Sequence, residues 1–276
     1  MWNLWIDFKY GVLHSKSWIP KLITLNVAVY IILLVFQLIT RYAEGVEVYY
    51  SIYSFIAMPA NFSEFILKPW TIITYSFVHS GFWHLLFNMI GLYWFGKIFE
   101  LFLMYRYTLR LYLIGAIAGG LAFIISYNML PALSKSAILV GSSASVMAFL
   151  LAATTLSPRY PLYLFLLGRV ELRFIALAFV ILDILFLGFS NTGGHIAHLG
   201  GALAGFLFVR WLSKPTQKPY IPFRIRKKKK QRRTPMDDEI DRILDKIREQ
   251  GLSSLTDEER KLLDEYSKRI SGNNKR

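Results

Sequence analysis

Long apolar stretches, separated by short polar segments, fill the first 213 residues of the chain. An α-helix needs roughly 20 mostly apolar residues to cross about 30 Å of hydrocarbon. Six stretches are long enough, and they lie near 22–40, 83–103, 108–127, 137–156, 172–190 and 194–212. They are too long and too continuous for strands, and a helix satisfies its own backbone hydrogen bonds in lipid. The pattern therefore predicts an all-α membrane protein with a bundle of six transmembrane helices.

Two segments outside these stretches are rich in aromatic residues. Residues 1–21 hold Trp2, Trp5 and Tyr10 among polar residues, which predicts an interfacial segment and not a signal peptide. The first loop, about 42–82, contains many aromatic side chains but no full span. We expect this loop to lie in the membrane interface or to dip into the membrane against the helices.

Charge divides the chain near position 213. The formal net charge is +14, and 20 charged residues lie among the first 213 positions against 30 among the last 63. We therefore expect a transmembrane domain over 22–213, a basic juxtamembrane linker over 214–235 and a tail over 236–276. The chain has no cysteine, which excludes disulfides, thiolate metal sites and a cysteine nucleophile.

The linker carries the basic run Arg224–Arg233. A basic run next to a membrane span is attracted to anionic lipid head groups. Nucleic-acid binding is the alternative for any such run, and we favour lipid because this run directly follows a span. No nucleic-acid partner is therefore expected.

The tail shows a helical pattern after Pro235. Apolar residues recur at helical spacing, at Ile240, Ile243, Leu244 and Ile247. Gly251 is a natural stop, and Thr256 followed by Glu259 forms a capping box that begins a second helix. The pattern predicts a C-terminal cytoplasmic helical hairpin.

The distribution of lysine and arginine predicts the orientation of the spans. With six spans, one side of the membrane receives the N-terminal segment, the loops after spans two and four, and the basic linker. The other side receives only Arg41, Lys68 and Lys135 near its loops. We expect both termini to be cytoplasmic and the even-numbered spans to run inward from the outer face.

Polar side chains gather at one depth of this predicted bundle. His84 and Asn88 lie four residues apart near the start of span two, Ser143 lies near the start of span four and His198 near the start of span six. At 1.5 Å per residue these groups fall within one helical turn of each other in depth. A serine, histidines and an asparagine at one level could supply a nucleophile, a base and oxyanion donors.

Small residues around these positions predict close helix packing. Gly201 and Gly205 form a G-x-x-x-G pattern on span six, and Ala144 and Ala148 are four apart on span four. Small residues at this spacing let two helix backbones approach closely. A serine and a histidine on neighbouring helices need such an approach, because both side chains are short.

Neighbouring residues compete for the two central roles. Ser142 and Ser145 are rotated by about 100° and 200° from Ser143 on a helix. His195 lies nearly one turn closer to water than His198, so we interpret it as a gate or a hydrogen-bonding neighbour. Asp183 falls in the middle of span five, where a carboxylate could belong to a proton relay. We interpret it instead as a neutral or hydrogen-bonded structural residue that faces the bundle, because no histidine or lysine partner is expected at its depth.

The sequence from about residue 20 to 213 resembles the rhomboid family of intramembrane serine proteases. The matching stretches, in the family's order and spans, are Pro69–His79, His84–Asn88, the G-x-S motif Gly141–Ser143, and His198–Gly201 with Gly205. The tail resembles short helical tails of some bacterial members. The resemblance implies a rhomboid-like six-helix bundle in a membrane, with the bacterial inner membrane as the expected compartment.

The resemblance also implies roles for these residues. Ser143 would be the nucleophile and His198 the general base, in a dyad without an acid. His84 and Asn88, with the Ser143 backbone amide, would bind the oxyanion. Gly141, like the small residues above, would pack around the site. No metal, nucleotide or organic cofactor is implied.

Three positions depart from the family pattern. Ala144 replaces the glycine that usually follows the nucleophile, and Met147 replaces an aromatic residue that often stacks on the histidine. Thr71 follows Trp70 where the family often has arginine. We expect a looser but occupied site, since a thioether also packs on an aromatic ring.

We therefore expect an intramembrane serine endopeptidase that cleaves transmembrane protein substrates near the outer face of the membrane. By resemblance, its substrates would have helices that unwind easily and small residues at the cleavage point. The first alternative is a catalytically inactive relative that binds transmembrane helices. The second is a transporter or channel, which would need paired charges along a path through the membrane. The sequence does not indicate an oligomeric state.

Overall fold

The structure is a computed structural model that describes residues 9–134, 136–164, 168–189, 191–212 and 235–273. The chain divides into two compact units, Met1–Ile221 and Pro222–Arg276. The predictions that concern Trp2, Trp5 and the basic run Arg224–Arg233 fall outside the described residues.

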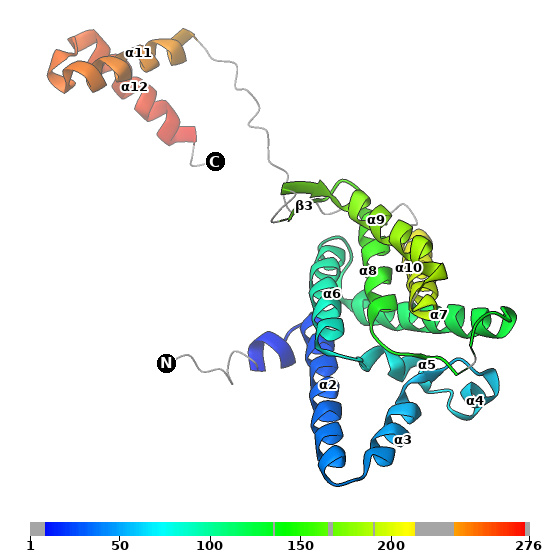
Figure 1. Cartoon of the computed structure of the whole chain (residues 1–276). Coiled ribbons are helices and arrows are strands. Elements are labelled where there is room, and N and C mark those ends of the chain that lie inside the picture. The colour runs from blue at the N-terminus through cyan, green and yellow to red at the C-terminus, as the bar shows by residue number, and fades with distance from the viewer. Residues whose placement is uncertain (1–8, 135, 165–167, 190, 213–234, 274–276) are drawn as a thin grey trace. The chain divides into compact units, whose positions relative to one another are not determined.

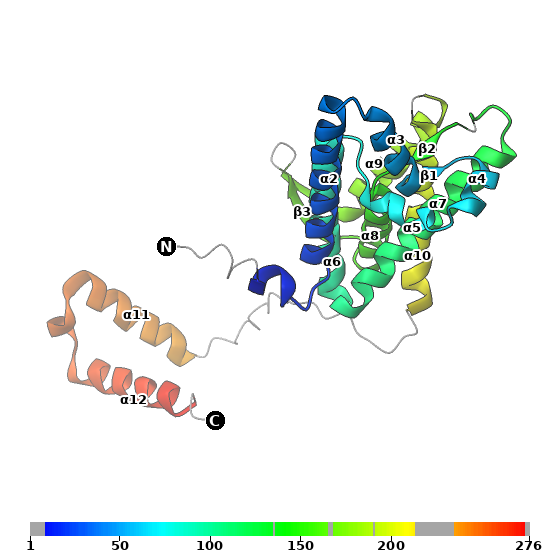
Figure 2. The ribbon, with the colours of Figure 1, turned by 90° about the horizontal axis from the view of Figure 1, so that it is seen from below.

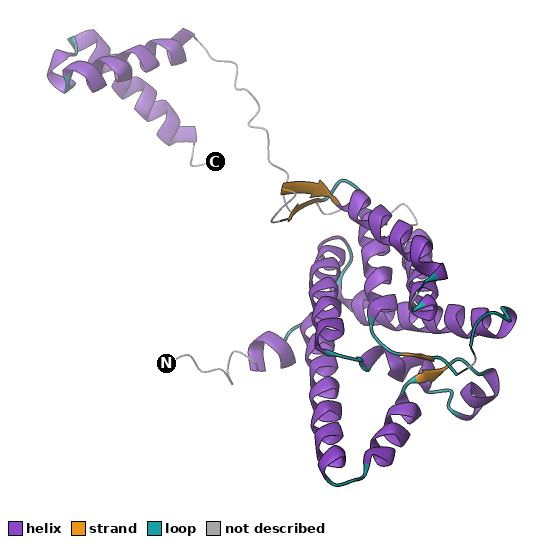
Figure 3. Ribbon diagram, viewed as in Figure 1, coloured by secondary structure: helices purple, strands orange, loops and turns teal. Residues whose placement is uncertain are grey.

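The first unit is mostly helical (Figure 3). Four of its described helices are long and apolar enough to cross a membrane: α2 (Ile19–Tyr42), α6 (Phe82–Phe102), α7 (Thr108–Met129) and α10 (Thr192–Leu212). Two shorter helices are α8 (Ser143–Leu156) and α9 (Leu172–Leu185). A single turn, η1 (Lys9–Leu13), precedes α2, and two more lie between helices: η3 (Tyr105–Tyr107) and η4 (Phe186–Gly188).

The fourth and fifth predicted spans are shorter than expected. Both α8 and α9 have 14 residues, and 14 residues rise only about 21 Å along a helix. The first part of the stretch 137–156 is not helical, because Ile138–Leu139 (β2) pairs antiparallel with Met58–Pro59 (β1). The structure therefore supports four full-length spans within its described residues, and the count of six stays a prediction.

Short helices and turns occupy the first loop. They are α3 (Val46–Ile56), α4 (Phe62–Leu67), α5 (Thr71–Thr74) and η2 (Tyr75–Phe77). The Trp70 indole nitrogen donates to the Phe55 carbonyl at 2.8 Å, and the Thr74 hydroxyl donates to the Ile56 carbonyl at 2.7 Å. The buried Tyr75 hydroxyl donates to the Ala116 carbonyl on α7 at 2.7 Å. The loop is thus folded on itself and fixed to the helical domain, with Thr71 buried within it.

Helix α8 is the central element of the first unit. It packs against α6, α7 and α10 (Figures 1 and 2), and nine of its residues are buried, from Ala144 to Ala153. On the side away from the first loop, β3 (Pro161–Leu164) pairs antiparallel with β4 (Gly168–Glu171) between α8 and α9. This central position is why the first turn of α8 can be reached from several helices at once.

Glycines make the contacts of α8 close. A Cβ atom at Gly201 or Gly205 of α10 would overlap the backbone carbonyls of Ala144 or Ala148. Gly115 and Gly119 of α7, which also packs against α10, face the same two alanines. The α7 pair is likewise spaced by four residues, and its role was not predicted from the sequence.

The second unit contains two described helices, α11 (Pro235–Gln250) and α12 (Asp257–Asn273), joined through η5 (Leu252–Ser254). Its small core has Ile240, Ile243 and Leu255 buried, whereas Leu244 of the predicted stripe is about half exposed. The capping box forms as predicted: the Thr256 amide donates to Glu259 Oε2 at 2.8 Å and the Glu259 amide to Thr256 Oγ1 at 3.3 Å. Hydrogen bonds from Lys246 and from the Thr256 backbone hold the pKa of Glu259 below its usual value.

Candidate active site

Ser143 is the first residue of α8 and lies half-buried at its N-terminus. The predicted span 137–156 puts Ser143 about six residues inside a helix, but the helix begins only at Ser143, after β2 and a turn. The consequence for chemistry is favourable. The first amides of a helix have no partner within the helix and carry partial positive charge, so the Ser143 amide can donate to an anion.

Gly141 is required by the turn that precedes Ser143. Its backbone φ is +115°, which residues other than glycine rarely adopt. A Cβ atom at this position would also lie 2.6 Å from Nε2 of His84. The Gly141 amide donates to the Tyr75 carbonyl at 3.0 Å, which fixes the turn to the first loop. The G-x-S motif therefore combines a turn that glycine adopts readily with space for the His84 ring.

His84 and Asn88 present their side chains to the same region from α6. His84 Nδ1 is hydrogen-bonded to Ser80 Oγ at 3.0 Å, so its Nε2 is the nitrogen that faces Gly141. The Asn88 amide nitrogen donates one hydrogen to the His84 carbonyl at 2.8 Å and retains a second hydrogen. Both residues are thus oriented by local partners.

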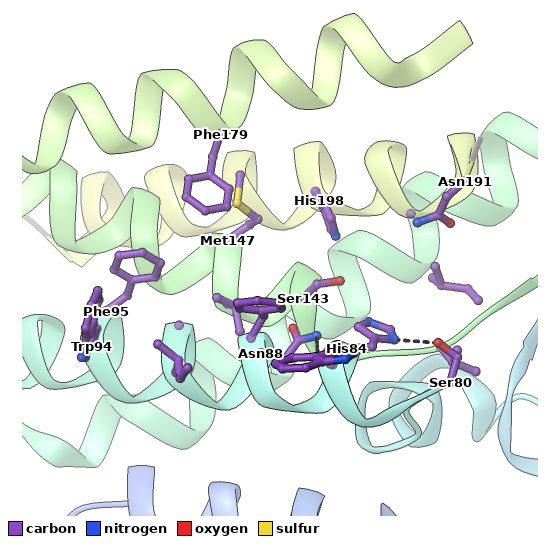
Figure 4. Close-up of a pocket in the computed structure, with 18 of the residues that line it drawn as sticks. Ser80, His84, Asn88, Trp94, Phe95, Ser143, Met147, Phe179, Asn191 and His198 are labelled. Carbon is purple, nitrogen blue, oxygen red and sulfur yellow. Dashed lines mark hydrogen bonds between the residues drawn. The ribbon is translucent and has the colours of Figure 1, made fainter. Parts of the chain in front are cut away.

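A pocket of about 950 Å³ brings the four predicted residues together. Ser143, His198, His84 and Asn88 all line it. Figure 4 shows the His198 imidazole, from α10, pointing toward the Ser143 hydroxyl, with His84 and Asn88 on the α6 side. The rest of the wall is largely apolar and aromatic: Trp83, Phe87, Trp94, Phe95, Ile175 and Phe179.

The competing serines have other partners. The Ser145 hydroxyl donates to the Tyr112 carbonyl at 2.7 Å, and Ser142 Oγ lies 3.3 Å from His79 Nε2. Both are fully buried, whereas Ser143 is only half-buried. Ser143 is thus the serine of the three that lines the pocket.

One premise of the interpretation of Asp183 is wrong, because this side chain does have histidine partners. His195 Nδ1 and His198 Nδ1 each lie 2.8 Å from Asp183 Oδ1. Helix α9 ends at Leu185 and does not extend to residue 190, so Asp183 lies near a helix end and not at mid-span. A carboxylate is therefore present at the level of the histidines, contrary to the expectation of a site without an acid. The carboxylate of Asp183 was noticed in the sequence, but the predicted span 172–190 placed it too far from the end of the helix.

Ala144 and Met147, two of the positions that depart from the family pattern, are both buried. Ala144 directs its Cβ toward Gly119 of α7, where another Cβ would overlap it. Met147 is buried and lines the pocket. The His198 ring packs nearly perpendicular to the His195 ring, with 5.9 Å between the ring centroids.

Asp183, His195 and His198 form a group whose potential ligand atoms lie within 4.8 Å of one another. Histidine nitrogen and carboxylate oxygen are a donor set that zinc accepts. Both Nδ1 atoms, however, lie at hydrogen-bond distance from Asp183 Oδ1. Asp183 Oδ1 and the two Nδ1 atoms are therefore already engaged with one another in the described arrangement.

Comparison with known proteins shows the family of this chain. Residues 67–215 match the model of the Rhomboid domain, and this range contains every residue of the pocket described above except Tyr53. The chain belongs to the rhomboid family. It is an integral membrane protein.

Two relatives from Arabidopsis thaliana extend the comparison. RHOMBOID-like protein 12, mitochondrial, is 34% identical over 145 residues, which are 48% of this chain and 43% of that protein. Rhomboid-like protein 17, chloroplastic, is 31% identical over 152 residues, or 49% and 46% of the two chains. The chain thus matches less than half the length of each relative. Residues 224–269 match a separate family of unknown function.

Proposed function

We propose that this rhomboid-family protein is an intramembrane serine endopeptidase that hydrolyses peptide bonds in or near transmembrane segments of other proteins. The observation that carries the proposal is the convergence of Ser143, His198, His84 and Asn88 on one pocket. These residues come from three helices and supply a nucleophile, a base and hydrogen-bond donors.

The proposed reaction uses each of these groups once. His198 Nε2 accepts the Ser143 hydroxyl proton while Oγ bonds to the scissile carbonyl carbon. The Ser143 amide, the second hydrogen of the Asn88 amide and His84 Nε2–H stabilise the oxyanion. His198 then gives its proton to the leaving amine, and water hydrolyses the acyl-serine by the same steps in reverse. The Ser80 hydroxyl, by donating to His84 Nδ1, would keep the His84 proton on Nε2.

The apolar wall of the pocket suits a transmembrane substrate. Trp83 and Phe87 of α6 are about two-thirds exposed, and Phe179 of α9 is nearly half exposed. Phe95 and Phe179 meet edge-to-face across these two helices at 6.5 Å. A substrate segment would enter between α6 and α9 and unwind near Ser143, because a helical backbone hides its carbonyls from a nucleophile.

The remaining expectations complete this proposal. The domain crosses the membrane six times, with both termini cytoplasmic, and lies in the bacterial inner membrane. The names of the two plant relatives refer to mitochondria and chloroplasts. The proposal of a bacterial inner membrane therefore rests only on the resemblance of the tail. The basic run Arg224–Arg233 binds anionic lipid head groups, which vesicle sedimentation at low and high salt would test.

Cleavage of a model transmembrane substrate in proteoliposomes tests the proposed activity. Ser143→Ala and His198→Ala should each abolish cleavage while insertion and purification remain normal. His195→Ala should retain substantial activity, because His195 does not line the pocket. Equal cleavage by the wild type and Ser143→Ala would refute a serine mechanism. A wild type that binds the substrate helix without cutting it would instead identify an inactive relative.

A further inference from the structure

The His198 ring has a hydrogen-bonding partner that a mechanism with Ser143 and His198 alone does not include. His198 Nδ1 lies 2.8 Å from Asp183 Oδ1, and both side chains are largely buried, at 22% and 6% exposure. Asp183 comes from α9 and His198 from α10. The contact therefore fixes the ring from a neighbouring helix.

The identity of the acceptor decides which nitrogen carries the proton. A carboxylate oxygen only accepts hydrogen bonds, so an ionised Asp183 places a proton on His198 Nδ1. The neutral ring then has its lone pair on Nε2, the nitrogen left to face Ser143. A general base needs this tautomer, because the other one would present an N–H to the hydroxyl.

We propose that Asp183 is a positioning residue for the proposed protease reaction and completes a Ser143–His198–Asp183 triad. It holds His198 in the Nδ1–H tautomer and stabilises the imidazolium that forms when Nε2 takes the serine proton. The Nδ1 proton stays on His198 throughout the reaction. Asp183 therefore acts through the histidine and does not touch the substrate. This inference rests on the proposed function.

The surroundings of Asp183 favour this role over a purely structural one. Asp183 is 4% exposed, and its Oδ2 has no hydrogen-bond partner among the described residues. A buried oxygen without a partner costs stability, so such groups call for an explanation. Its Oδ1 accepts hydrogen bonds from Nδ1 of His195 and Nδ1 of His198. A charge in this buried setting acts strongly on its neighbours.

His195 supplies the matched control. It makes the same 2.8 Å contact to Asp183 Oδ1 from the same helix as His198, and its ring stacks on Phe186 at 5.9 Å. If Asp183 only ties α9 to α10, loss of either histidine contact should have similar effects. If Asp183 positions the base, only the His198 contact matters for turnover.

The experiment measures kcat and KM for a transmembrane substrate with full-length protein in proteoliposomes. Asp183→Asn preserves the shape but can stabilise the wrong tautomer, and it should lower kcat at least about 100-fold with little change in KM. Asp183→Glu, which restores a carboxylate, should recover part of the loss. His195→Gln should stay within about threefold of wild type.

Three further measurements separate this role from instability, from the other tautomer and from a metal site. Thermal unfolding of Asp183→Asn should show that the variant is folded at the assay temperature, so that its lower kcat does not reflect instability. Nitrogen-15 NMR of histidine-labelled wild type, assigned with His198→Ala, should show the proton of neutral His198 on Nδ1. EDTA should leave wild-type activity unchanged.

Several results would overturn the inference. They are wild-type kcat in Asp183→Asn, equal losses in Asp183→Asn and His195→Gln, a proton on His198 Nε2, or inhibition by EDTA. Each leaves the proposed function standing if the wild type cleaves and Ser143→Ala does not. Absence of cleavage by the wild type would instead remove the proposed function itself.

Discussion

At the scale of single residues, the side chains around Ser143 have partners that fix their directions. His84 is held by Ser80, and Asn88 donates to the His84 carbonyl. His198 is held by Asp183. Preorganised donors are effective because they need no reorganisation when charge develops in the transition state. The residue-scale predictions therefore separate groups that act on the reaction from groups that act on the fold.

Asn88→Ala should lower kcat about 10²–10³-fold, because loss of one oxyanion donor has this effect in serine hydrolases. The matched control is Asn128→Ala. Asn128 donates to the Ala60 and Ile124 carbonyls, both at 2.7 Å, and so joins the first loop to α7. This control should lower the melting temperature and leave the specific activity of folded protein unchanged. A lower melting temperature with unchanged specific activity in Asn88→Ala would show that Asn88 is a packing residue.

His79 should make the stability of the fold depend on pH. Burial, followed by the nearby His84 ring, lowers the pKa of His79 to about 4, whereas a histidine in the unfolded chain titrates near 6.5. Between these values the unfolded state binds a proton and the folded state does not. Stability should therefore fall as the pH drops from about 6.5 to about 4, by roughly 3 kcal/mol at most.

The check on His79 is thermal unfolding of wild type and His79→Gln at pH 7 and pH 5. Gln keeps a hydrogen-bonding group near Ser142, which lies 3.3 Å from His79 Nε2, but does not titrate. The variant should lose less stability between the two pH values than wild type. The same loss in both proteins would exclude His79 as the source.

At the scale of elements, the active site depends on backbone contact between α8 and its neighbours. Gly201 lies against the Ala144 carbonyl, and His198 precedes Gly201 by three residues on α10. Any separation of α8 from α10 therefore moves the proposed base away from the proposed nucleophile. Misplacement by about 1 Å can cost 10²-fold in rate.

Gly201→Ala should lower both stability, by about 1–3 kcal/mol, and turnover, because its methyl group would overlap the Ala144 carbonyl. Gly188→Ala is the control, since a Cβ at Gly188 meets nothing within 4 Å. Thermal unfolding and cleavage assays on the same preparations measure both effects. Wild-type behaviour of Gly201→Ala would mean that the α8–α10 contact is looser than described.

The bounds of some helices could be predicted from the sequence, and those of others could not. Hydrophobic length predicted α2, α6, α7 and α10 within a few residues, because long apolar helices are specified locally. The start of α8 was misplaced because the pairing of β2 with β1 joins segments about 80 residues apart. The same limit applies to Asp183. Its contact with His198 depends on where α9 ends, and element boundaries are the least certain part of a sequence prediction.

At the scale of the whole molecule, the chain consists of two units that are each compact. Every residue that lines the pocket belongs to the first unit. The second unit has its own small core and its own capping interactions, and it matches a separate family. The two units therefore carry separable properties.

Deletion of residues 236–276 should leave proteolysis of a model substrate in detergent nearly unchanged, because no catalytic group lies in that segment. We expect the tail to affect partner binding or regulation in cells. Cleavage rates of the truncated and full-length proteins, each checked for folding by thermal unfolding, measure this. A folded truncated protein without activity would show that the tail supports the helical domain.

The most direct test of the central claim is labelling of purified full-length protein with a fluorophosphonate serine probe, followed by peptide mapping of the adduct. A fluorophosphonate reacts with a serine only when a base activates it. We predict a single adduct on Ser143 in the wild type, none in Ser143→Ala, and strongly reduced labelling in His198→Ala. An adduct on Ser142, Ser145 or any other serine, or labelling that persists in Ser143→Ala, would contradict the account.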